Sequence, residues 1–263
     1  MFCVVVAYGV TQLHDVVYIV CSWSPRIVRF NTTTHERLPD IHVEDMEVPQ
    51  DIVACEQTSQ LYVADNLQYV WRVSADGDDI YVQLWWTWSS TDTFAPPATL
   101  SVTSTRLLVT SSKQLMQLDS LGNELRHVQL PDDMYTEHAV ESPTATFIVT
   151  HINTQVKPHR GQISEVNTDG QVLRQFTGSR LSSLGFTPHV AIDSHGNILV
   201  ADFRKGRILL LDAQLKLRRL IIDEHQLNYE PGVRTCRLCY REQTGQLLVG
   251  LGHRVTVFDV LCR

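Results

Sequence analysis

Short apolar runs separated by turn-forming residues recur along the whole chain. The clearest stretch covers residues 188–222 and holds four such runs, each rich in Val, Ile and Leu: His189–Asp193, Asn197–Asp202, Arg207–Asp212 and Leu217–Ile222. None of these runs is long enough, or periodic at 3.6 residues, to be a helix of ordinary length. The pattern predicts four short antiparallel strands in this unit.

The same unit occurs six times. Each copy carries an apolar residue, two variable positions, a second apolar residue and then Asp, Asn or Ser: Ile27–Asn31, Val70–Ser74, Leu115–Asp119, Ile163–Asn167, Ile208–Asp212 and Val255–Asp259. Successive copies begin 43 to 48 residues apart, a period typical of propellers and other repeat arrays. We therefore expect one all-β domain, a six-bladed β-propeller of four-stranded antiparallel blades. The expected blades cover residues 1–45, 46–90, 91–132, 133–180, 181–227 and 228–263.

The last blade is expected to be incomplete. It offers only three strands, Thr235–Tyr240, Gly245–Gly250 and Arg254–Asp259, whereas the first blade is expected to begin with a strand at Phe2–Tyr8. Either the outer edge of the last blade stays open, or an upstream segment supplies the missing strand. Natural sheets usually cover such an edge, because its unpaired backbone groups invite pairing with other chains.

The polar residue that ends each repeat is expected to start a turn, since Asp and Asn side chains bond to the backbone two residues further on. In copies two to four a glycine follows three residues later, at Gly77, Gly122 and Gly170, where it adopts a positive φ without steric cost. In copy five Leu215 stands in that position. We therefore expect another kind of turn, or a bulge, in blade five.

Two segments, VADN at 63–66 and VADF at 200–203, resemble the NHL repeat, as does the stretch from Pro188 to Asp212. The resemblance covers essentially the full chain, and copies two and five are the closest to the family pattern. It implies a six-bladed propeller similar to the C-terminal domain of tripartite-motif (TRIM-NHL) proteins, where such domains present substrates or RNA to a ubiquitin-ligase front end. The sequence contains no RING-like or B-box-like Cys/His array and no heptad coiled coil. A ligase role would therefore depend on a region outside it.

The distribution of charged residues says more about the expected partner than about the fold. The formal net charge is −7, which argues against a general nucleic-acid or anionic-membrane binder. Residues 1–100 hold 4 basic and 13 acidic side chains, whereas residues 201–263 hold 11 and 7, so one side of a closed ring should be acidic and another mildly basic.

The cysteines and the apolar stretches indicate a compartment. Cys236 and Cys239 have the spacing of a zinc-ligand pair, but no second pair completes a set of four ligands. The N-terminus lacks the pattern of a signal peptide, and no apolar stretch is long enough for a membrane helix. We expect a reduced, soluble, cytoplasmic protein.

The first strand of each blade should line the central channel, and four polar residues near the starts of these strands are expected at its mouth: Asp51, Thr99, His138 and His189. The two histidines lie in adjacent blades and should point at the mouth together. Peptide-amidating lyases resemble NHL propellers and bind zinc through channel histidines, but a zinc site needs at least three protein ligands, and the matching residue of the last blade is expected to be Cys236. We expect polar residues at a wet channel mouth, with no metal, no cofactor and no catalytic group.

Loops on the same face are expected to carry the residues that bind a partner. These are Trp23, Asn66, Lys157, His159, Arg160, Arg180, Phe203, Arg204, Lys205 and His253. The Lys and Arg residues among them belong to blades four and five and could contact phosphates, with Phe203 stacking on a base.

The expected function is non-catalytic recognition of a protein partner, as a scaffold or as the substrate-recognition module of a TRIM-type ubiquitin ligase. The alternative is an RNA-binding NHL propeller that acts in post-transcriptional regulation through blades four and five. A metal-dependent lactonase or lyase is a further alternative, but the lactonase type needs a carboxylate-rich channel, which Asp51 alone does not supply. Binding to DNA or to a membrane is not expected.

Overall fold

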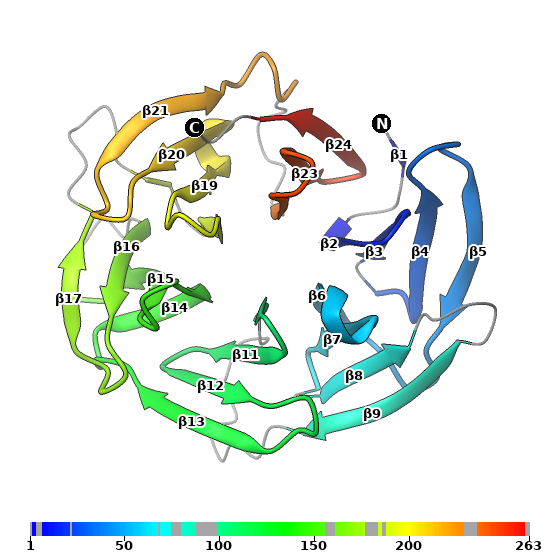
Figure 1. Ribbon diagram of the computed structural model, residues 1–263, viewed down its shortest axis with the longest axis horizontal. Helices are drawn as coiled ribbons and strands as arrows, with labels where there is room; N and C mark the ends of the chain where they lie inside the picture. Colours follow the sequence, from blue (N-terminus) through cyan, green and yellow to red (C-terminus); the bar gives the residue numbers. More distant parts are fainter. Residues whose placement is uncertain are drawn as a thin grey trace.

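Six four-stranded antiparallel sheets stand in a ring around a central channel (Figure 1). This computed structural model describes residues 2–3, 7–21, 23–67, 69–74, 80–87, 99–155, 161–176, 184–185, 188–228 and 236–260. In blades one to five the strands follow chain order from the channel to the rim. The predicted six-bladed propeller is confirmed.

Each of the first five blades consists of four consecutive strands. They are β2 (Ala7–Leu13), β3 (Val16–Cys21), β4 (Arg26–Asn31) and β5 (Arg37–His42) in blade one; β6 (Pro49–Cys55), β7 (Gln60–Asp65), β8 (Tyr69–Ser74) and β9 (Tyr81–Thr87) in blade two; β10 (Thr99–Thr103), β11 (Arg106–Ser111), β12 (Gln114–Leu118) and β13 (Glu124–Gln129) in blade three; β14 (Met134–Glu141), β15 (Phe147–Asn153), β16 (Gly161–Val166) and β17 (Val172–Gln175) in blade four; and β18 (His189–Ile192), β19 (Ile198–Asp202), β20 (Arg207–Leu211) and β21 (Leu217–Ile222) in blade five.

Blade six is completed by the other end of the chain. It contains β22 (Cys236–Arg241), β23 (Gln246–Leu251) and β24 (Arg254–Asp259), and β1 (Phe2–Cys3) pairs antiparallel with β24 as its fourth strand. The expectation that Phe2–Tyr8 opens blade one is therefore wrong, because β2 begins only at Ala7. The N-terminal residues instead cover part of the outer edge of β24, which satisfies backbone groups that would otherwise be unpaired.

The apolar core lies between the blades. The second strands, such as β7 and β11, are buried along almost their whole length, because neighbouring blades cover both faces of each sheet. One buried cluster accordingly joins blades two and three and includes Tyr62, Val70, Leu100 and Val109. The outer strands meet water at the rim, and most of β21 is exposed.

The turns after the third strands explain the polar residue of the repeat. Asp119 Oδ1 accepts two backbone N–H groups of its own turn at 2.8 and 2.9 Å, and Asp212 Oδ1 accepts two at 2.9 Å. Gly122 adopts φ +90° in the first of these turns, and Leu215 adopts φ +57° at the same place in the second. The expectation of a different turn at Leu215 is therefore wrong, whereas the expected alternative, a bulge in blade five, is present where the register of β20 and β21 shifts between Leu210 and Leu211. The side chain of Leu215 is buried in the cluster between blades four and five, and this burial offsets the cost of the left-handed conformation. The predicted turn glycine Gly77 lies outside the described residues.

Helical structure is limited to single turns in the described part of the chain. These are the 3₁₀ helices η1 (Glu56–Thr58) and η2 (Phe203–Lys205). No described helix is long and apolar enough to cross a membrane.

Candidate functional site

Six equivalent positions, one in each blade, form a ring in the channel near the ends where the first strands begin. The residue after each of them pairs with a fully buried Val or Ile of the second strand, which defines the equivalence. The six are Gly9, Asp51, Thr99, His138, His189 and Arg237. The residue that matches the histidines in blade six is therefore Arg237, and the expectation of Cys236 is wrong by one position.

The side chains of this ring bond neighbouring blades to one another. Oδ2 of Asp51 in blade two accepts the backbone N–H of Leu100 in blade three at 2.9 Å. Nε2 of His138 in blade four lies 3.2 Å from the carbonyl oxygen of the same Leu100, to which it donates. Oγ1 of Thr99 donates to the carbonyl oxygen of Glu137 at 3.0 Å. These residues therefore hold blades two, three and four together from inside the channel.

An ion pair joins blade six to blade two, although blade one lies between them. Nε of Arg237 is 3.3 Å from Oδ1 of Asp51, and both side chains are largely buried. Blade one contributes Gly9, at which a Cβ would lie 2.7 Å from the backbone nitrogen of Ile52 and 2.9 Å from Cγ2 of Val20. Glycine at this position therefore allows blade one to approach blade two and adds no side chain to the ring.

Burial controls the protonation of the ring. Desolvation, helped by the positive charge of Arg237, lowers the pKa of His138 to about 3. Desolvation, together with the neighbouring His138 and the positive charge of Arg237, holds the pKa of His189 well below its ordinary value. Desolvation also raises the pKa of Asp51, against the opposing effect of the Arg237 charge. Both imidazoles are therefore neutral at pH 7.

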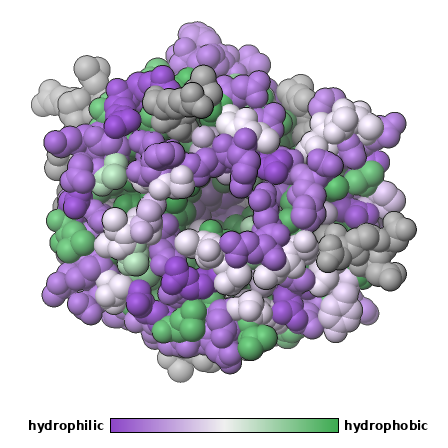
Figure 2. Space-filling view, in the orientation of Figure 1, coloured by the Kyte–Doolittle hydropathy of each residue, from purple (hydrophilic) through white to green (hydrophobic). Residues whose placement is uncertain are grey.

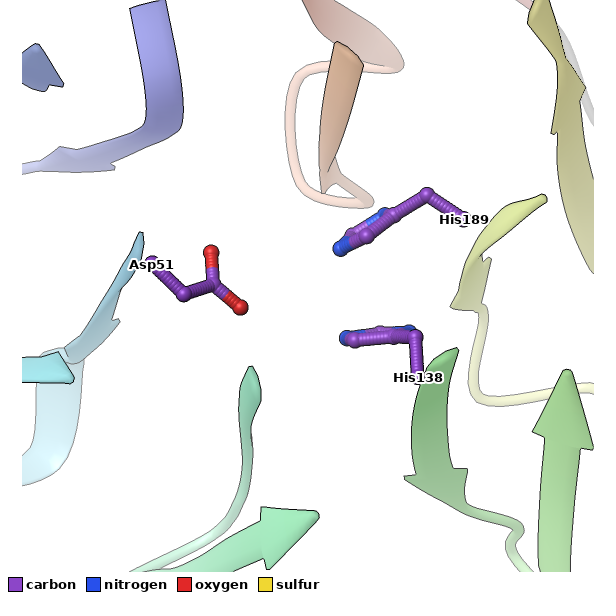
Figure 3. Close-up of side chains that lie close together, drawn as sticks. All are labelled: Asp51, His138 and His189. Atoms are coloured by element: carbon purple, nitrogen blue, oxygen red, sulfur yellow. The ribbon is translucent and has the colours of Figure 1, made fainter. Parts of the chain in front are cut away.

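Asp51, His138 and His189 point towards one another (Figure 3), and one potential ligand atom of each lies within 4.8 Å of the others. The two imidazole rings are stacked, with their centroids 3.7 Å apart. Imidazole and carboxylate are the groups that bind zinc in catalytic sites, so the cluster has a ligand set of the right chemical type.

The backbone hydrogen bond of His189 and the charge of Arg237 oppose metal binding by this cluster. The N–H of Leu238 donates to Nδ1 of His189 at 3.3 Å, so the neutral ring carries its proton on Nε2. His138 also carries its proton on Nε2, because that atom donates to a carbonyl oxygen. A metal-bound histidine normally donates its second ring N–H to an acceptor, the reverse of the arrangement at His189. His138 has the arrangement of a metal ligand, because its Nδ1 keeps a buried lone pair with no hydrogen-bond partner in the described part of the chain. Arg237, in contrast, adds a positive charge that disfavours a cation. That the channel binds no metal stays a prediction, and the tautomer of His189 and the charge of Arg237 are its physical basis.

A small cavity lies in the channel beside the ring. Its volume is about 170 Å³, and it is lined by all the ring residues of blades two, four, five and six. Figure 2 shows a hollow at the centre of the face in view, surrounded mainly by hydrophilic residues. A further cavity of about 460 Å³ is lined by residues of the hairpins between first and second strands, among them Glu56, Glu141 and Glu242.

Several predicted face residues lie on loops between second and third strands, on one face of the propeller. Trp23, Asn66, Arg204 and His253 are exposed there, and Lys205 is partly buried. The predicted residues Lys157, His159, Arg160 and Arg180 lie outside the described residues.

Phe203 is not a surface residue. Its ring is buried in the cluster that joins blades five and six, with Leu227 and Leu251. It begins η2 directly after Asp202, which is itself fully buried, so the loop turns the ring inwards. The expectation that Phe203 stacks on a nucleotide base is therefore wrong.

The aspartates of the two Val-Ala-Asp segments fix the loops that enter their own blades. Oδ1 of Asp65 accepts the backbone N–H of Val48 at 3.1 Å. Oδ1 of Asp202 accepts the backbone N–H of Gly185 at 2.9 Å, while its Oδ2 is 2.9 Å from the guanidinium of Arg207. Both carboxylates therefore organise the backbone of these loops.

No protein-family model matches this sequence, and no curated protein matches it either. Solved structures are similar in fold. A protein of unknown function from Bacteroides caccae has a TM-score of 0.64 at 15% identity, over 89% of this chain and 81% of that chain. Hydrazine synthase from Kuenenia stuttgartiensis has a TM-score of 0.65 at 12% identity, over 98% of this chain and 96% of that chain. At such identities the similarity shows the propeller fold alone, and the NHL resemblance stays a prediction.

Proposed function

We propose that this propeller is a non-catalytic recognition domain that binds a protein partner through the face that carries Trp23. The side chain of Trp23 is 78% exposed, and its backbone is held at φ +56°. A bulky residue rarely adopts a left-handed conformation, and such strain concentrates at binding sites. Tryptophan is also enriched among the residues that contribute most to protein interfaces. The exposed side chain of Trp23 on a left-handed backbone is the observation that carries the proposal.

The roles of the channel residues support the absence of catalysis. Asp51, Thr99, His138 and His189 each bond a neighbouring blade, so the ring contributes to the scaffold. The more specific role, substrate recognition for a TRIM-type ubiquitin ligase in the cytoplasm, rests on the NHL resemblance.

The RNA alternative has less support. The RNA alternative relied on Phe203 as the residue that stacks on a base, and this side chain is buried. We therefore do not propose RNA as the ligand.

The test is affinity capture from a matched lysate with the wild-type protein, the Trp23→Ala variant and a Leu121→Ala control. Leu121 is also 78% exposed, but it lies in a hairpin between third and fourth strands, on the opposite face. Loss of an interface tryptophan should weaken binding by about thirtyfold, whereas the control should bind like the wild type. Circular dichroism verifies that both variants fold. Equal capture by Trp23→Ala and the wild type, or capture that nuclease abolishes, would contradict the proposal.

A further inference from the structure

We propose that the partner segment bound at this face is basic and docks on an acidic, aromatic surface of blades one and two. We call this the Trp23 surface and define it as Trp23, Glu44, Asp45, Glu47 and Leu67. The inference rests on the proposed function, in that it takes Trp23 as a docking residue, and it adds the chemistry of the partner.

Backbone hydrogen bonds join three loops into this surface. The N–H of Val43 donates to the carbonyl oxygen of Pro25 at 2.8 Å, which fixes loop 43–48 beside the loop of Trp23. The N–H of Asn66 donates to the carbonyl oxygen of Val48 at 3.0 Å, which fixes the loop of Leu67 on the other side. The buried carboxylate of Asp65 strengthens this second junction, since its Oδ2 accepts the N–H of Glu47 at 2.9 Å. The five side chains therefore project from one preorganised backbone.

The surface carries unpaired negative charge. Glu44, Asp45 and Glu47 are exposed, and none of them forms an ion pair within the described residues. Arg26, the first residue of β4, and His42, the last residue of β5, are exposed beside these loops, and the single charge of Arg26 leaves the surface negative. The wider field has the same sign, because residues 1–100 hold 13 acidic and 4 basic side chains.

The apolar members of the surface suit the same kind of partner. The exposed face of an indole attracts Lys and Arg cations more strongly than any other aromatic side chain does. Leu67, which is 41% exposed, can pack against the aliphatic stem of such a residue while its charged end reaches a carboxylate. RNA and anionic membranes would be repelled by the three carboxylates. A Lys- and Arg-rich segment of a protein therefore fits both the charge and the aromatic group.

The first experiment uses a fluorescein-labelled peptide of alternating lysine and glycine as a probe, with fluorescence anisotropy as the readout. The surface variant combines Glu44→Gln, Asp45→Asn and Glu47→Gln, and asparagine is used because it tolerates the φ of +66° at Asp45. The control variant combines Asp132→Asn, Asp169→Asn and Glu224→Gln, which removes the same charge from exposed positions on blades three to five.

The surface variant should lose about tenfold in affinity, Trp23→Ala about threefold, and the control variant less than twofold. Binding to the wild type should weaken as salt increases, because the charges are exposed. Equal losses in the surface and control variants would mean that only net charge attracts the probe, and this result would overturn the proposal.

The second experiment separates this inference from the proposed function. A zero-length carbodiimide cross-linker joins carboxylates to lysines, so a captured partner should be linked through its lysines to Glu44, Asp45 or Glu47, as mapped by mass spectrometry. If the partner requires Trp23 but binds the surface variant with full affinity, the recognition function stands and the basic partner is refuted. If the partner is retained by Trp23→Ala and by the surface variant alike, both proposals fail.

Discussion

At the scale of single residues, two turns allow the free-energy cost of a left-handed backbone to be measured separately from the stabilisation that comes from burying a side chain. Leu215 has φ +57° and Ala145 has φ +58°, and each donates its N–H to the carbonyl oxygen three residues earlier, at 2.9 and 3.0 Å. The conformations are alike, but the side chain of Leu215 is buried and that of Ala145 is exposed. The two positions should therefore respond in opposite directions to glycine.

Leu215→Gly should lower the free energy of unfolding by about 2–4 kcal/mol, because a cavity left by leucine costs more than relief of the strained φ returns. Ala145→Gly should raise it by up to about 1 kcal/mol, since relief of the strained φ exceeds the extra conformational entropy that glycine gives to the unfolded chain. Urea unfolding followed by tryptophan fluorescence measures both. Changes of the same sign at the two positions would show that burial of Leu215 does not decide the conformation of its turn.

The buried histidines make stability depend on pH. Since the pKa of His138 falls from the ordinary 6.5 to about 3 on folding, the unfolded chain binds the proton first as the pH drops. The stability contributed by the neutral ring is complete above pH 6.5 and is lost progressively down to about pH 3. In that window each such histidine should add a slope of about 1.4 kcal/mol per pH unit to the free energy of unfolding.

His138→Asn should therefore flatten the dependence of unfolding free energy on pH between 6 and 4.5, compared with the wild type in urea titrations. His225→Gln serves as the control, because this side chain is 89% exposed. An unchanged slope in His138→Asn would mean that this ring is protonated in the folded state.

At the scale of strands and blades, what the sequence could predict depended on how local the signal was. The strand Leu217–Ile222 was predicted with the bounds that the structure has, because apolar content and turn residues mark both of its ends. Two-residue β1 escaped prediction, since its apolar run continues towards β2 and its partner Val255 lies at the other end of the chain.

In the candidate site, too, local signals in the sequence predicted the residues and contacts between distant segments escaped prediction. The repeat placed His138 and His189 at equivalent positions of adjacent blades, and the structure brings them together. The repeat did not lead to a prediction of Arg237, although the sequence contains the signal that would have identified this residue. The apolar Leu238 follows Arg237, just as Val190 follows His189. The contact between Arg237 and Asp51 skips a blade, so no comparison of neighbouring repeats reveals it. Phe203 was misplaced because the spacing marks a loop and does not show which way a loop side chain turns.

The short β1 strand should matter to blade six more than its length suggests. Deleting residues 1–3 removes the pairs Phe2↔Val255 and Cys3↔Arg254 and exposes the whole outer edge of β24. We expect a loss of about 1–2 kcal/mol in unfolding free energy, and amide hydrogen exchange in β24 that is faster by about tenfold or more. Exchange in β7, in blade two, is the internal control. Unchanged protection of β24 would show that β1 does not close the blade.

At the scale of the whole molecule, two contacts close the ring of blades, one at the rim and one in the central channel. At the rim β1 pairs with β24, and in the channel the ion pair between Arg237 and Asp51 spans blade one. The inner contact is costly to form, because both charges leave water, and costly to break, because one buried charge is then left uncompensated. Its contribution to stability should therefore appear as a coupling between the two residues.

A double-mutant cycle with Arg237→Met and Asp51→Asn measures this coupling by chemical denaturation. Each single change should lower the free energy of unfolding by about 3–5 kcal/mol, since it strands the opposite charge in the channel. The double variant should be destabilised by at least about 1 kcal/mol less than the sum of the two, because neither charge is left. Arg237→Met should also raise the pKa of His138 and His189, which the guanidinium lowers, and so reduce the pH dependence of stability. Additive losses and an unchanged pH dependence would mean that the two side chains do not act as a pair, and that the propeller is held closed by β1 and the apolar contacts between blades.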